Sequence, residues 1–213
     1  MSATALATLR RSRLVPVVTV HDLDRVDAIA TGLADGGVRC IEVTLRTALG
    51  FEAIARISGL GILQVGAGTV LDPSDVDAAV DAGATFVVSP GLDEAVLERA
   101  LARGAAALPG VATASELQRA RQAGLDHVKL FPAATLGGLR LVEVLHQPFP
   151  GISFLPSGGV TATTAAEYLA HPAVFAVGSS WLVPSAGHGD LYGEVRRRAE
   201  ESIASLPGGV DRG

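Results

Sequence analysis

The sequence predicts a single-domain α/β protein of the (β/α)8 TIM-barrel class with an additional N-terminal helix. Short β-rich runs alternate with longer amphipathic segments from Leu14 almost to the C-terminus, which is the pattern of βα units around a parallel sheet. The β-rich runs number eight, as in a closed barrel. Hydrophobic residues make up 48% of the 213 residues and charged residues 18%, which suits helices packed on a buried sheet. We expect one domain over residues 1–213, with the barrel core at about 14–205.

Each expected strand is followed by a helical segment. In chain order the strands are residues 15–20, 40–44, 63–68, 86–89, 106–110, 127–131, 153–156 and 175–178. Residues 3–11 are the expected extra helix, which would close the bottom of the barrel, residues 191–205 the last outer helix and 207–213 a frayed tail. The sequences Asp72-Pro73-Ser74 and Thr113-Ala114-Ser115-Glu116 mark helix starts. A doubly wound open sheet is the alternative, but no dinucleotide-binding fingerprint follows the first strand.

Charge and cysteine content limit the classes of partner and location. The net charge of -5 and the pI near 5.5 argue against nucleic acid as a partner, because a phosphate backbone must be met by clustered basic residues. Cys40 is the only cysteine, so no internal disulfide can form and a reducing compartment is expected. No apolar run reaches the length of a signal peptide or a membrane span. We therefore expect a cytoplasmic protein with a small-molecule substrate and no membrane partner.

Lysine is almost absent from this chain. Of the 17 basic residues only Lys129 is a lysine, and the other 16 are arginines. Lysine can lose its proton and form an imine with a carbonyl, which arginine cannot do. Lys129 is therefore a candidate for chemistry, although a bias in base composition could also leave one lysine by chance.

Polar side chains fall at the carboxyl ends of the expected strands, where barrel enzymes place their active sites. By the period-two alternation of a strand, Glu42, Thr44 and Arg46 share one side, so an acid lies inside the barrel mouth with a guanidinium group above it. A structural ion pair is the alternative. In the same way Lys129 shares a face with His127 and Phe131, a position at which the free amine is favoured over the charged ammonium.

Gly/Ser-rich loops follow the third, seventh and eighth strands. The segment Gly66-Ala67-Gly68-Thr69 offers a hydroxyl and a close backbone approach, although an ordinary turn would look the same. After the last two strands come the runs 156–161 and 177–181, and barrels commonly build phosphate sites from these two loops. The five histidines are scattered, which disfavours a metal site, and no cofactor is expected.

Seven motifs in this order resemble the 2-keto-3-deoxy-6-phosphogluconate (KDPG) aldolase family, also described as 2-keto-4-hydroxyglutarate (KHG) aldolase. They are Glu42-Val43-Thr44-Leu45-Arg46-Thr47, Val65-Gly66-Ala67-Gly68-Thr69-Val70, Ser89-Pro90-Gly91, Pro109-Gly110, Lys129-Leu130-Phe131-Pro132-Ala133, Ser157-Gly158-Gly159 and Gly178-Ser179-Ser180-Trp181-Leu182-Val183-Pro184. The likeness runs from about Val15 to Pro184. Ser179 and Leu130 depart from the usual family residues, as does the run Ala134-Thr135-Leu136, which affects the expected aldehyde preference and not the imine chemistry.

The resemblance implies a class I aldolase that cleaves KDPG to pyruvate and glyceraldehyde 3-phosphate through a lysine Schiff base, with 4-hydroxy-2-oxoglutarate as a further substrate. It also implies a homotrimer. By this resemblance, Lys129 would form the imine and Glu42 would transfer protons. Arg46 and Thr69 would bind the pyruvate carboxylate, and Pro90 and Phe131 would line the pocket. The phosphate would be bound by Gly158, Gly159, Gly178 and Ser180. The alternatives are another phosphosugar barrel enzyme (an epimerase, isomerase or synthase) and a non-catalytic phosphometabolite-binding barrel.

Overall fold

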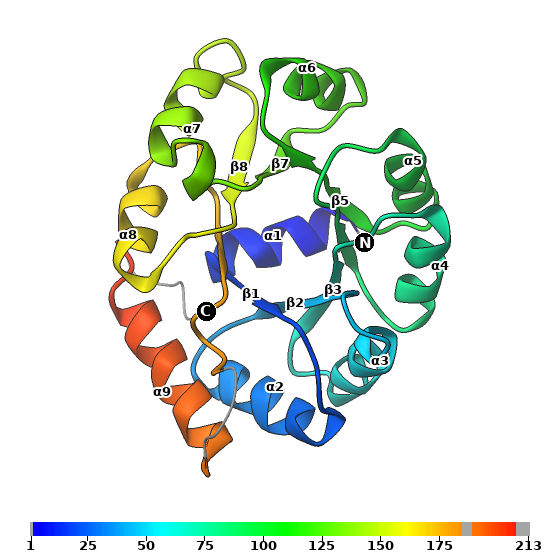
Figure 1. Ribbon diagram of the computed structural model, residues 1–213, viewed down its shortest axis with the longest axis vertical. Coiled ribbons are helices and arrows are strands. Elements are labelled where there is room, and N and C mark those ends of the chain that lie inside the picture. Colours follow the sequence, from blue (N-terminus) through cyan, green and yellow to red (C-terminus); the bar gives the residue numbers. More distant parts are fainter. Residues whose placement is uncertain (1, 185–188, 208–213) are drawn as a thin grey trace.

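The computed structural model describes residues 2–184 and 189–207, which form an α/β barrel (Figure 1). Its strands are β1 (Leu14–Val18), β2 (Cys40–Thr44), β3 (Gln64–Gly68), β4 (Phe86–Val88), β5 (Ala106–Leu108), β6 (Gly110–Val111), β7 (His127–Leu130), β8 (Ser153–Pro156) and β9 (Val177–Ser179). All paired strands are parallel. The expected tail beyond Pro207 lies outside the described residues.

The strands follow one another around a closed circuit. One sheet has the order β5-β4-β3-β2-β1-β9 and a second has the order β6-β7-β8. The first and last strands of the chain pair directly, with Leu14 opposite Val177. The two sheets are joined between β8 and the segment just before β9, where Phe154 and Val174 form a parallel bridge. The Phe175 N–H also donates to the Phe154 carbonyl at 3.1 Å. The alternative of an open sheet is therefore wrong.

The fifth strand differs from the sequence prediction. Residues 106–110 do not form one strand, because Pro109 separates β5 from β6. Proline has no N–H to donate to a neighbouring strand, so the ladder is interrupted there. The Pro109 carbonyl still accepts a hydrogen bond from the Lys129 N–H at 3.0 Å. Two short strands thus occupy one position of the eight-position barrel.

Helices cover the outside of the sheet, as Figure 1 shows, and α1 crosses the centre of that view. The described helices are α1 (Ser2–Ser12), which does not belong to this outer layer, and α2 (Val26–Asp35), α3 (Gly50–Leu60), α4 (Pro73–Asp81), α5 (Glu94–Ala102), α6 (Ala114–Gln122), α7 (Leu139–His146), α8 (Ala162–Ala170) and α9 (Leu191–Ala204), with 3-10 turns η1 (Leu23–Arg25) and η2 (Ala134–Leu136). The predicted helix starts are confirmed, since capping boxes form at Asp72 and Thr113. Among the described residues no helix is long and apolar enough to cross a membrane.

Helix α1 packs against the interior of the barrel. Its residues Ala5 and Leu9 are buried in one cluster with interior residues such as Phe86 and Leu155. His127, at the first position of β7, contacts Arg10 of this helix, with 2.7 Å between His127 Nε2 and the guanidinium nitrogen. The amino ends of the strands are thus covered by α1, as predicted. The carboxyl ends remain as the place for a site.

Candidate active site

A lysine and a glutamate from opposite sides of the barrel meet near the carboxyl ends of the strands. Lys129 comes from β7 and Glu42 from β2, which face each other across the closed circuit. Lys129 Nζ donates to Glu42 Oε1 at 3.2 Å, and the two residues are only 6% and 1% exposed. Glu42 Oε2 is buried and has no hydrogen-bond partner among the described residues. Because buried polar atoms rarely stay unpaired, this oxygen is available to a ligand or a water.

A glycine and an aromatic ring define the surroundings of this pair. A Cβ on Gly68 would lie 2.7 Å from Glu42 Cγ and 2.8 Å from Glu42 Cδ, so only glycine leaves room for the carboxyl group. The ring of Phe131, just beyond β7, lies 5.4 Å from Lys129 Nζ. The half-buried ring therefore forms a wall beside the amine.

Arg46 and Thr69 come together at the rim, from the loops after β2 and β3. Arg46 is exposed, and its Nε donates to Thr69 Oγ1 at 3.2 Å. Thr69 has a φ of 59°, a left-handed conformation that is unfavourable for a β-branched residue. Such strain concentrates at functional sites, where the surrounding structure imposes it. The structure therefore joins a guanidinium group and a hydroxyl just beyond the carboxyl ends of β2, the strand of Glu42, and its neighbour β3.

Pro90 is half-buried beyond β4, and its backbone is fixed against β6. A Cβ on Gly110 would lie 2.9 Å from the Gly91 nitrogen and still nearer to the Pro90 carbonyl oxygen. Gly110 is also the partner of Lys129 in the strand register. The close approach at Gly110 thus couples the position of Pro90 to the strand beside the lysine.

The loop after β8 packs against strand β9 and against the segment that follows Lys129. A Cβ on Gly178 would lie 2.8 Å from the Cβ of Ser157, which is itself buried. Gly158 and Gly159 have φ values of 86° and 84°, in the left-handed region that favours glycine. A Cβ on Gly159 would lie only 2.5 Å from the Cβ of Ala134. The two Gly/Ser loops predicted to act together are therefore in contact through Ser157.

Ser180 follows β9 directly and is exposed. It lines a cavity of about 210 Å³ together with residues after β1, among them Thr19, His21 and Arg25. Ser180 thus borders a cavity that His21, Asp22 and Arg25 also line.

Two other side chains of the interior that could be reactive, Cys40 and His127, do not belong to this site. Burial raises the pKa of the Cys40 thiol to about 12, so this residue stays protonated at neutral pH. His127 contacts Asp126 as well as Arg10, with Nδ1 2.5 Å from Asp126 Oδ1, so it belongs to the α1 end of the barrel. Among residues 2–184 and 189–207, no group of three potential metal ligands is close enough to hold an ion; His188 lies outside these ranges.

The sequence assigned no individual role to two residues of this region. Gly68 makes room for Glu42, and Ser157 joins the two Gly/Ser loops. Both lie within motifs, but their importance depends on contacts with distant residues. A glycine at the end of a strand that neighbours an acid-bearing strand is the only signal that could have indicated Gly68.

Comparison with known proteins agrees with this geometry. The profile of the family "Aldolase: KDPG and KHG aldolase" matches residues 6–195. A "2-dehydro-3-deoxy-phosphogluconate aldolase" of Treponema pallidum is 43% identical over 183 residues, covering 85% of this chain and 87% of the relative.

Solved structures are similar over nearly the whole length. The KDPG aldolase of Zymomonas mobilis ZM4 with 3-phosphoglycerate has a TM-score of 0.92 and 36% identity, covering 99% of this chain and 100% of the other. The KDPG aldolase of Legionella pneumophila, with pyruvate captured as a covalent carbinolamine, has a TM-score of 0.88 and 33% identity, covering 93% and 97%. With the buried lysine and glutamate in the mouth of the same barrel, these similarities establish that the chain belongs to the KDPG and KHG aldolase family.

Proposed function

We propose that this protein is a class I aldolase that cleaves KDPG to pyruvate and glyceraldehyde 3-phosphate through a Schiff base on Lys129. The observation that carries the proposal is the buried amine of the only lysine, 3.2 Å from the carboxyl group of a buried glutamate. Membership of the aldolase family supports the reaction class, and the carbinolamine captured in the Legionella pneumophila relative supports a covalent path.

Schiff-base formation requires a free amine and a group that moves protons. Lys129 Nζ attacks the C2 carbonyl of the keto acid, and Glu42 accepts the proton that the nitrogen loses. Glu42 then returns this proton to the carbinolamine oxygen, a second proton from the solvent reaches the same oxygen, which leaves as water, and a protonated imine remains. The 3.2 Å separation of Nζ and Oε1 supports both transfers without movement of either backbone.

Cleavage uses the imine as the electron acceptor. Glu42, directly or through a water, takes the proton from the C4 hydroxyl, the C3–C4 bond breaks, and its electron pair passes to the imine nitrogen. The aldehyde leaves, and an enamine of pyruvate remains on Lys129. Protonation at C3 and hydrolysis by water release pyruvate and restore the amine. The unpaired Oε2 of Glu42 is a suitable atom for the contact with the C4 hydroxyl or with the water.

We assign the carboxylate of the substrate to Arg46 and Thr69. A guanidinium group matches a planar carboxylate with two donors, and the hydroxyl of Thr69 adds a third. Their hydrogen bond holds the two groups together beyond the carboxyl ends of β2 and β3. Pro90 and the Phe131 ring would then form the walls that align the reacting carbon with the amine.

We assign the phosphate end to Gly158, Gly159, Gly178 and Ser180. The N–H groups of Gly158 and Gly159 donate to no acceptor among the described residues, and helix α8 begins directly after their loop. Free backbone N–H groups near a helix N-terminus attract anions. The exposed Ser180, directly after β9, borders a cavity, and its hydroxyl would supply a further donor.

A second reaction and two properties of the whole protein complete the proposal. A relative from Escherichia coli K12 carries the name "KHG/KDPG aldolase", which supports 4-hydroxy-2-oxoglutarate as a further substrate, cleaved to pyruvate and glyoxylate. We propose a homotrimer on the basis of the family resemblance alone, to be tested by analytical ultracentrifugation. A cytoplasmic location is consistent with the single, buried and unpaired Cys40.

The decisive experiment is reduction with borohydride in the presence of pyruvate, followed by peptide mass spectrometry. We expect one adduct, on Lys129, and complete loss of cleavage in Lys129→Arg, because a guanidinium group cannot form an imine. Glu42→Gln, which keeps the shape but not the proton transfer, should lower kcat about 10²- to 10⁴-fold.

Two results would contradict the proposal. Turnover in Lys129→Arg would favour another phosphosugar enzyme, such as an epimerase, isomerase or synthase. Binding of phosphorylated sugars without any turnover in the parent protein would favour a non-catalytic binding barrel.

A further inference from the structure

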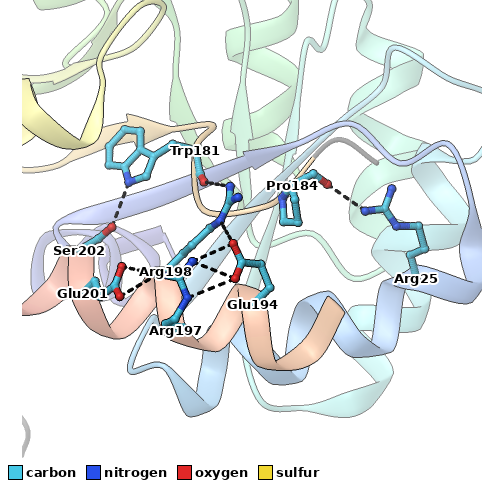
Figure 2. Close-up of polar contacts among 8 residues, drawn as sticks. All are labelled: Arg25, Trp181, Pro184, Glu194, Arg197, Arg198, Glu201 and Ser202. Carbon is cyan, nitrogen blue, oxygen red and sulfur yellow. Dashed lines mark hydrogen bonds and ion pairs between the residues drawn. The ribbon is translucent and has the colours of Figure 1, made fainter. Parts of the chain in front are cut away.

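The loop that follows β9, residues 180–184, is held from outside the barrel by two arginine side chains (Figure 2). We call these residues the β9 loop. Arg198 of α9 donates from its guanidinium group to the Trp181 carbonyl at 2.9 Å. Arg25, at the start of α2, donates to the Pro184 carbonyl at 2.8 Å. Backbone carbonyls near both ends of the loop therefore have charged donors, and hydrogen bonds from charged donors are stronger than those from neutral ones.

Helix α2, which directly follows Arg25, and helix α9, which carries Arg198, are packed closely together. A Cβ on Gly32 of α2 would lie 2.9 Å from the Tyr192 carbonyl oxygen of α9. A Cβ on Gly36 would lie 2.5 Å from the Ala199 side chain. Only glycine allows the backbones to approach so closely, so α2 and α9 form a firm support for the loop.

The Arg198 side chain is itself fixed on α9. Its Nε donates to Glu194 Oε1 at 2.7 Å, one helical turn earlier, and the same carboxylate also accepts from Arg197. These two guanidinium groups lower the pKa of Glu194 below its usual range. Glu194 therefore stays ionised and orients Arg198, which leaves the NH1 group of Arg198 directed at the Trp181 carbonyl.

The indole of Trp181 is held on the same helix by a polar contact. Its Nε1 donates to the hydroxyl of Ser202 at 2.9 Å, and Ser202 is only 8% exposed. A cavity of about 480 Å³ lies next to the indole and is lined by Trp181, Ser202 and residues of α8 and α9 such as Thr163. This side of the loop faces an open depression, so the hydrogen bonds from Arg198 and to Ser202 add to the packing that holds Trp181.

We propose that Arg198 is a positioning residue for the phosphate end of the substrate. Its hydrogen bond fixes the Trp181 carbonyl, and Trp181 directly follows Ser180 in the chain. Arg198 thus sets the position of the Ser180 hydroxyl from the outer surface of the barrel, without contact with the substrate. This inference rests on the proposed function, in which Ser180 binds the phosphate.

The test replaces Arg198 with methionine, which keeps the aliphatic stem and removes the donor; Glu194 retains Arg197 as a partner. We expect kcat/KM for KDPG to fall about tenfold, mainly through KM, which is the size of one hydrogen bond from a charged donor. Pyruvate trapping on Lys129 should stay within about twofold, since pyruvate has no phosphate. The matched control is Arg196→Met on the same helix, whose partner is the exposed Glu200, and it should change neither quantity.

A double-mutant cycle with Ser180→Ala shows whether Arg198 acts through Ser180. If it does, adding Arg198→Met to the Ser180→Ala variant should lower kcat/KM by a further factor of less than about three. A full tenfold further loss there would overturn the proposal. So would an unchanged kcat/KM in the single variant, or an equal loss of cleavage and trapping, which would mean that Arg198 only supports the fold.

A second variant keeps the proposal testable if Arg198→Met does not fold. Ser202→Ala removes the acceptor of the Trp181 indole and should raise KM for KDPG about threefold with unchanged trapping, and no rise in KM would contradict the proposal. Failure of the proposed function is visible separately, as the absence of a pyruvate adduct on Lys129 in the parent protein.

Discussion

Replacing Gly68 with alanine would place a methyl group where the Glu42 side chain lies. The new Cβ would be 2.7 Å from Glu42 Cγ, 2.8 Å from Cδ, and nearer still to Oε1. Carbon atoms in contact stay about 3.5–4.0 Å apart, so the side chain must move by roughly 1 Å. Glu42 is 1% exposed and its strand is buried, so the carboxyl end is the part that can move. The 3.2 Å contact with Lys129 Nζ would change by a similar amount.

The cost should be larger for activity than for stability. A misplacement of about 1 Å in a catalytic group lowers the rate about 10²-fold, which is about 2.7 kcal/mol of activation free energy. Overpacking a buried site costs about 1–3 kcal/mol in the free energy of unfolding. We expect the lower end of that range, because the clash is with the end of a side chain. The melting temperature should then fall by only about 2–4 °C.

The assay compares kcat for KDPG with the melting temperature in Gly68→Ala and in Gly66→Ala. The control lies two residues earlier on the same face of β3, and its new Cβ would overlap the buried Phe86 ring and not Glu42. We expect Gly66→Ala to lose more stability but to keep kcat within about threefold. The reasoning is refuted if Gly68→Ala keeps full kcat, or if both variants lose activity in proportion to stability.

Four further outcomes are expected. Ser180→Asp should lower kcat/KM for KDPG by about 10²-fold, because a carboxylate would face the phosphate, while pyruvate trapping on Lys129 stays nearly unchanged. Cleavage activity should survive EDTA, since the imine is the electron acceptor. Loss of activity with EDTA that a divalent ion restores would contradict this expectation. Cys40, whose pKa burial raises to about 12, should react with iodoacetamide only after unfolding. Arg99 and Arg103, near the end of α5, donate hydrogen bonds to Asp77 and lower its pKa. These contacts therefore stabilise the folded protein at any pH above the unfolded-state pKa of Asp77, and the stabilisation is lost as the pH falls through the folded-state pKa. Thermal melts should therefore show Asp77→Asn less stable than the parent at pH 7 and equal to it in strong acid.

Much of the fold and the inward positions of Glu42 and Lys129 could be predicted because the signals are local. Alternation along β2 and β7 put Glu42 and Lys129 on inward faces, and the structure agrees. The capping box at Thr113 depends on residues three positions apart and was equally visible. Barrel closure followed from the number of strands, because eight parallel strands with outer helices leave few other arrangements.

Contacts between distant segments could not be predicted in this way. Periodicity assigns a residue to a face, but it does not say which atom of another strand the side chain meets. The fit of Gly68 against Glu42, and the hydrogen bond of Arg198 to the Trp181 carbonyl, depend on distances that only the folded chain defines. The division of the fifth strand at Pro109 was missed for a different reason. A proline can end a ladder or remain at its edge, and the sequence alone does not decide between the two.

The distribution of basic residues also bears on the chemistry of this barrel. Arginine keeps its proton at physiological pH, so the 16 arginines can hold loops, carboxylates and helices without competing for a carbonyl carbon. Burial keeps the one thiol, Cys40, protonated. Lys129 is therefore the only side chain that can form an imine, and apart from the amino terminus no other amine exists. A single covalent adduct per chain is thus a consequence of composition, while the site of that adduct depends on the position of Glu42 across the barrel.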